Sequence, residues 1–79
     1  MRKLSEIRAR IDEIDAQLVA LLNERARCAQ QIGELKHHAR KPYFTPEREQ
    51  SIYRRLQKLN RGPLTPEQLQ AIFREIISV

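Results

Sequence analysis

The sequence is poor in the residues that build large cores. It contains no tryptophan, two glycines and one cysteine, and 5% of its 79 residues are aromatic. A chain this short with few large apolar side chains can form one small domain with a thin core. The single cysteine, Cys28, excludes an intrachain disulfide. Because it falls on an apolar helical face, we expect a buried, reduced thiol.

Other absences exclude whole classes of protein. There is no uninterrupted apolar run of about 18 residues, and the start MRKLSEIRAR lacks the apolar stretch of a signal peptide, so we expect a cytoplasmic protein without a membrane span. No glycine-rich loop suggests a nucleotide site, and no Ser/His/Asp or Cys/His set suggests a nucleophile. His37 and His38 have no third ligand at helical spacing, so no metal is expected.

Positive charge is abundant but dispersed. Fifteen Lys and Arg residues against ten Asp and Glu residues give a net charge of +5. The basic residues extend over the whole chain, many of them interleaved with acids, and they form no basic tract. A nucleic-acid-binding helical dimer is therefore a minor alternative, and it predicts binding that falls steeply with salt. A small anionic ligand held by a few fixed cations fits the distribution better.

Apolar residues recur at alternating steps of three and four, which predicts one long amphipathic helix over about residues 5–38. These residues, the apolar seam, are Leu4, Ile7, Ile11, Ile14, Leu18, Leu21, Cys28, Ile32 and Leu35.

Thr45 followed by Pro46 predicts the start of a second helix over about 46–59, with Gly62 as a helix stop. Thr65 with Gln68 predicts a capping box and a third helix over about 66–78. No strand pattern occurs, so we predict one all-α domain over 1–79.

The three predicted helices differ too much in length to bury one another's apolar faces. The two short helices together extend about 40 Å, too little to cover the length and width of the seam. Covering the seam requires the same helix from a second copy, which predicts an intertwined helical homodimer.

Charged residues interrupt the apolar stripes. Arg25 occupies a seam position, and Lys36 lies on nearly the same face about 16 Å further along the helix. Glu49 begins the apolar stripe of the second helix, and Arg48 precedes it. A small dianion between Arg25 and Lys36 could be held at both ends. Alternatively, Arg25 pairs with Glu49, or with Glu24 of a partner helix, and fixes the register of a dimer.

Arg8 is too far from Arg25 to share a site within one chain, because it lies about 26 Å away along the helix axis. In an antiparallel dimer, Arg8 could enter the site of the partner. Alternatively, it is an exposed arginine that pairs with Asp12 or Asp15.

These residues belong to a longer pattern: Ile7-Arg8, Ile11, Ile14-Asp15, Leu18, Leu21-Leu22 and Arg25, then Ile32-Gly33 and Lys36, then Pro46-Glu47-Arg48-Glu49. In order, spacing and charge, the pattern resembles the all-helical chorismate mutases of the AroQ class over nearly the whole chain. It is most similar to the mutase domain at the N-terminus of a prephenate dehydratase, or to a free-standing version. The resemblance implies an intertwined dimer that converts chorismate to prephenate without a cofactor.

The resemblance also assigns roles to individual residues. Arg25 would hold one substrate carboxylate, and Arg8 of the other protomer would hold the second. Lys36 would donate to the ether oxygen of the breaking bond, and Glu49 would accept from the ring hydroxyl.

Two further roles follow from the same resemblance. Arg48 would brace the site electrostatically, and Thr45, where the family often has Asp, would contact the hydroxyl region.

One departure from the family pattern qualifies these expectations. The family's third helix normally continues past the point that matches Ile76–Val79, and it supplies a small polar residue for a carboxylate and a Gln or Glu for the ether oxygen. If preorganised charge dominates catalysis, the missing donor would lower activity by on the order of a hundredfold or more. An alternative is a weak or inactive regulatory and dimerisation module that binds chorismate or prephenate within a larger enzyme. A lyase acting on isochorismate is a further rival, but such relatives usually lack a carboxylate at Glu49.

Overall fold

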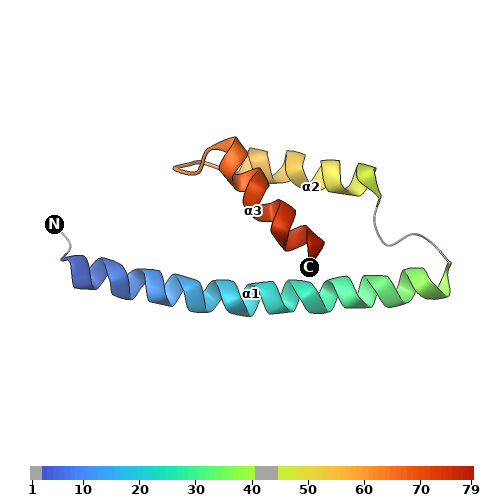
Figure 1. The fold of residues 1–79 in the computed structure, drawn as a ribbon, viewed down its shortest axis with the longest axis horizontal. Coiled ribbons are helices and arrows are strands. Elements are labelled where there is room, and N and C mark those ends of the chain that lie inside the picture. The colour runs from blue at the N-terminus through green and yellow to red at the C-terminus, as the bar shows by residue number, and fades with distance from the viewer. Residues whose placement is uncertain (1–2, 41–44) are drawn as a thin grey trace. The chain divides into compact units, whose positions relative to one another are not determined.

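The chain consists of three helices in a computed structural model, which describes residues 3–40 and 45–79. They are α1 (Leu4–His38), α2 (Pro46–Leu59) and α3 (Pro66–Ser78). No strand occurs among the described residues, so the predicted all-α class is confirmed. The chain divides into two compact units, Met1–Ile32 and Gly33–Val79, and α1 runs through the boundary between them (Figure 1).

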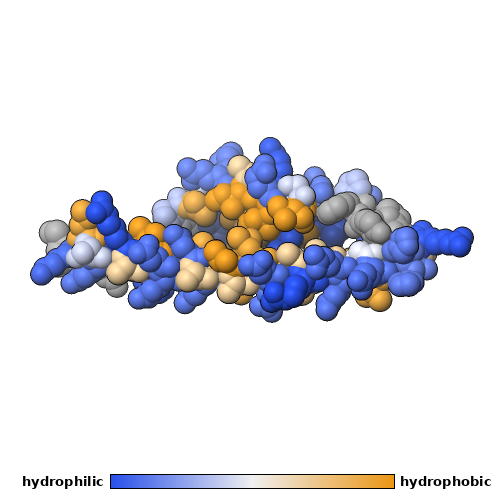
Figure 2. All heavy atoms as spheres, turned by 60° about the horizontal axis from the view of Figure 1, so that its bottom comes forward, coloured by the Kyte–Doolittle hydropathy of each residue, from blue (hydrophilic) through white to orange (hydrophobic). Residues whose placement is uncertain are grey.

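Helix α1 is long and amphipathic. It is about 52 Å long at 1.5 Å per residue, and none of its residues is buried. Along the apolar seam, the exposed fraction ranges from 38% at Ile14 to 70% at Leu35. Figure 2 shows hydrophobic side chains at the molecular surface. The prediction of a buried Cys28 is wrong for the single chain, because this thiol is exposed with the rest of the seam.

The C-terminal end of α1 closes with a change of backbone conformation. The Ala39 N–H donates to the Leu35 carbonyl at 3.1 Å, and the Arg40 N–H donates to the His37 carbonyl at 3.1 Å. Arg40 adopts a left-handed conformation with φ of 57°, which turns the backbone out of the helical path. The break in periodicity predicted over 40–44 begins here, and its positions 41–44 lie outside the described residues.

The starts of α2 and α3 are both fixed by threonine caps, as predicted. The Thr45 hydroxyl oxygen accepts from the Arg48 N–H at 3.2 Å. At α3, the Thr65 hydroxyl oxygen accepts from the Gln68 N–H at 3.1 Å, and the Gln68 amide oxygen accepts from the Thr65 N–H at 3.1 Å. Each cap satisfies a backbone donor that has no partner within its helix.

Asn60 organises the connection between α2 and α3. Its backbone N–H caps α2 by donating to the Leu56 carbonyl at 3.0 Å. Its side-chain oxygen accepts from the Gly62 N–H at 3.0 Å, and its side-chain nitrogen donates to the Leu64 carbonyl at 2.9 Å. Gly62 is therefore not the residue that ends α2. Its φ of 77° is needed later, within the turn.

We expect Asn60→Ala to lower the free energy of unfolding by about 1–2 kcal/mol, because two side-chain hydrogen bonds of the turn are lost. Chemical denaturation measures this change. Asn23→Ala is the matched control, since Asn23 donates one exposed hydrogen bond to the Val19 carbonyl at 3.0 Å. Alanine also favours the helix there, so the control should be nearly neutral. Equal losses in both variants would contradict this role of Asn60.

The core of the second unit lies between α2 and α3, where α3 returns from the loop against α2 (Figure 1). Ile77 is the one buried side chain of the described residues, with 7% of its surface exposed. Partly buried apolar or aromatic side chains from both helices complete the core: Ile52, Tyr53, Leu56, Leu69, Phe73 and Ile76. Leu59 and Ile72, which belong to the predicted stripes, stay 58% and 47% exposed.

Within residues 3–40 and 45–79, none of the helices combines the length and the apolar character that crossing a membrane requires.

Candidate functional site

Three of the predicted site residues lie on α1. Arg25 and Lys36 are partly buried, whereas Arg8 is exposed. The eleven-residue spacing on one continuous helix keeps Arg25 and Lys36 on nearly the same face. Arg8 makes no ion pair with Asp12 or Asp15. Among the described residues of α1, the ion pair that does form joins the Arg10 guanidinium to the Glu13 carboxylate, with 3.1 Å between nitrogen and oxygen.

The start of α2 holds the other three predicted residues. Thr45 is partly buried and caps the helix, and its hydroxyl proton stays available as a donor to a ligand. The Arg48 guanidinium is exposed and turns along its own helix, where it donates to the Ser51 hydroxyl at 3.4 Å. The Ser51 hydroxyl in turn donates to the Arg48 carbonyl at 2.7 Å. Arg48 is therefore directed along α2 toward Ser51.

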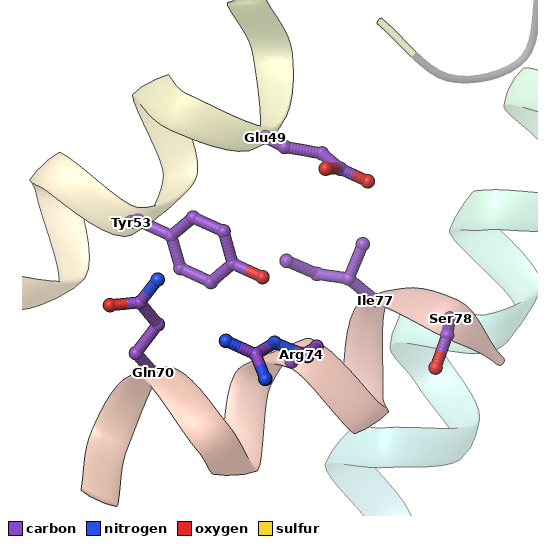
Figure 3. A pocket seen from close by; sticks show the side chains of 6 residues that line it. All are labelled: Glu49, Tyr53, Gln70, Arg74, Ile77 and Ser78. Atoms are coloured by element: carbon purple, nitrogen blue, oxygen red, sulfur yellow. The ribbon is translucent and has the colours of Figure 1, made fainter. Parts of the chain in front are cut away.

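Glu49 opens onto a pocket between α2 and α3. The pocket has a volume of about 480 Å³ and is lined by Glu49, Tyr53, Gln70, Arg74, Ile77 and Ser78. Figure 3 shows Glu49 and Tyr53 reaching from α2 and Gln70, Arg74 and Ile77 from α3 around the Tyr53 ring, while the Ser78 hydroxyl points away from it. Five of the six carry polar groups, and buried Ile77 supplies the apolar contribution. A few convergent polar groups around an apolar surface are typical of small-molecule sites.

The structure adds four polar residues that the sequence prediction did not include. Tyr53 follows Glu49 by four positions on α2, while Gln70, Arg74 and Ser78 repeat at steps of four on α3. Residues four apart lie on one face of a helix. The four-residue spacing is the sequence signal that could have identified these residues. It does not show which other helix the polar face lies against.

The two adjacent histidines contact each other. The rings of His37 and His38 lie edge to face, with centroids 6.1 Å apart. Over the described ranges 3–40 and 45–79, no three His, Cys, Asp or Glu side chains are grouped so that they could hold a metal ion.

Comparison with known proteins identifies relatives over nearly the whole chain. The family described as chorismate mutase type II matches residues 7–79. A bifunctional chorismate mutase/prephenate dehydratase from Aquifex aeolicus is 45% identical, with 99% of this chain and 23% of that protein covered. A chorismate mutase from Methanocaldococcus jannaschii is 44% identical over 75% of this chain and 60% of that protein.

The fold comparison agrees with the sequence relatives. The structure of chorismate mutase (form I) from Thermus thermophilus superimposes with a TM-score of 0.93 at 30% identity, covering 98% of this chain and 96% of that one. This chain spans between 18% and 23% of the length of the bifunctional relatives that it matches. Sequence and fold together show that the chain belongs to the chorismate mutase type II family.

Proposed function

We propose that this chain catalyses the Claisen rearrangement of chorismate to prephenate. The observation that carries the proposal is the family match over residues 7–79, joined by relatives named as chorismate mutases in both free-standing and bifunctional proteins. The second activity named in the bifunctional relatives acts on prephenate, the product proposed for this chain.

The chemistry suits a site built from fixed charges. The rearrangement is unimolecular and needs neither a covalent intermediate nor a cofactor, so a protein accelerates it by holding the reactive conformer and stabilising developing charge. Arg25 and Arg8 of a second protomer would bind the two carboxylates. Lys36 would donate to the ether oxygen as the bond to it breaks, and Glu49 would accept from the ring hydroxyl.

A homodimer completes this proposed site. The apolar seam of α1 is exposed along the whole helix in the single chain, and such a continuous apolar face is expected to be covered by a partner. A second α1 in antiparallel orientation covers the seam and carries its Arg8 toward the Arg25 region of the first. The active unit proposed here is therefore a dimer with two shared sites.

The loss of chorismate absorbance over time tests the proposed activity directly. We expect wild-type protein to consume chorismate and to produce prephenate in equal amount. Binding of chorismate or prephenate without turnover would contradict the mutase assignment and support the regulatory alternative.

Mixing two inactive variants tests the shared site. In a mixture of Arg8→Ala and Lys36→Ala chains, half of the dimers are mixed, and each mixed dimer has one site with both residues intact. Recovered activity should reach about a quarter of the wild-type value after unfolding and refolding together. The variants refolded separately and then assayed side by side are the control. Equal activity with and without joint refolding would show that Arg8 does not act across the dimer.

A further inference from the structure

The pocket between α2 and α3 contains opposite charges that are not joined directly. Glu49 and Arg74 both line it, and no ion pair connects them in the described part of the chain. In the view of Figure 3, the Tyr53 hydroxyl points between the Glu49 carboxylate and the Arg74 guanidinium. The other polar groups in the lining, those of Tyr53, Gln70 and Ser78, carry no formal charge in their ordinary forms.

A carboxylate in a site for a dianion creates an electrostatic problem, and here the inference rests on the proposed function. Glu49 would repel both carboxylates of chorismate while accepting from its ring hydroxyl. A nearby cation reduces this repulsion. Arg48, the preceding residue, is directed along α2 toward Ser51. Arg74 is the one cationic residue among those that line the pocket together with Glu49.

We propose that Arg74 is a positioning residue that offsets the charge of Glu49, so that this carboxylate can lie beside a dianionic substrate. Glu49 is partly buried and Arg74 is exposed, so water partly screens the attraction between their charges and its effect is modest. Arg74 acts through Glu49 and makes no contact with the substrate in this proposal.

Affinity for prephenate, measured by titration calorimetry, tests the proposal without requiring turnover. Arg74→Gln should weaken binding by roughly 3- to 10-fold, as expected for a partly screened charge interaction. Arg74→Lys keeps the charge and should stay within about twofold of wild type. Arg55→Gln is the matched control, because it removes an exposed arginine of α2 that does not line the pocket. An unchanged affinity in Arg74→Gln would overturn the proposal.

A double-mutant cycle separates the offset of Glu49 from direct binding. In a Glu49→Gln background, Arg74→Gln should change prephenate affinity by less than about twofold, because no charge remains to be offset. If the full loss persists in that background, Arg74 binds the ligand itself and the proposal is wrong. Circular dichroism of each variant checks that the helices are intact.

A second readout separates this inference from the proposed activity. If chorismate is not consumed but prephenate binds, the mutase assignment fails, and the binding cycle still decides the role of Arg74. If prephenate does not bind, the cycle is measured on thermal unfolding of the ligand-free protein. A double variant that loses less stability than the sum of the single variants supports the interaction, and additive losses overturn it.

Discussion

Lys36→Ala should lower kcat by about 100- to 1000-fold and change KM by only a few-fold. The proposed role of Lys36 is to donate to the ether oxygen, which gains negative charge in the transition state. Removing one preorganised donor of this kind has an effect of that size, on the order of 3–4 kcal/mol in activation free energy. The ground state carries less charge on that oxygen, so substrate binding should suffer less.

Chorismate absorbance under steady-state conditions measures both constants. Lys58→Ala is the matched control, since Lys58 is an exposed lysine of α2 that lies outside the pocket lining. The control should retain wild-type kcat and KM. A Lys36→Ala variant with raised KM and wild-type kcat would contradict this role. It would show that Lys36 binds the ground state and the transition state equally strongly.

Leu18→Asp should abolish the proposed dimer. Leu18 is 50% exposed in the single chain and lies in the middle of the apolar seam. Facing helices would bury an unpaired carboxylate there, which costs several kcal/mol for each copy. Because α1 has no buried residues of its own, loss of the partner should also lower its helix content and stop turnover.

Sedimentation equilibrium and circular dichroism measure these losses. Gln30→Asp is the control, since it places the same charge on an exposed position of α1 opposite the local seam. This variant should stay dimeric and active. A wild-type protein that sediments as a monomer, or a Leu18→Asp variant that remains dimeric, would contradict the proposed use of the seam.

Local interactions made most of the fold predictable. The caps at Thr45 and Thr65 depend on hydrogen bonds between residues three positions apart, so the sequence contains all that is needed. The heptad spacing of apolar residues likewise determines α1 without reference to any other element. The role of Gly62 was less predictable. Asn60, not Gly62, ends α2, and Gly62 adopts its left-handed conformation within the turn that follows.

The candidate site was predictable in part. The resemblance picked out Glu49 on α2, and Glu49 lines the pocket between α2 and α3; its role in binding stays a prediction. The pattern did not include Arg74, because a polar residue on α3 gains meaning only when α3 is placed against α2. The prediction for Cys28 failed in the single chain because a seam position becomes buried only when another helix covers it.

The sequence by itself determined the three helices, their caps, the apolar seam and the family, since each of these depends on residues close together in the chain or on a linear pattern. Only the tertiary structure decided that Glu49 and Arg74 line one pocket. Their proximity depends on the Asn60 turn and on the burial of Ile77 between two helices. Two residues that line one pocket but are distant in sequence leave no periodic signal in either helix.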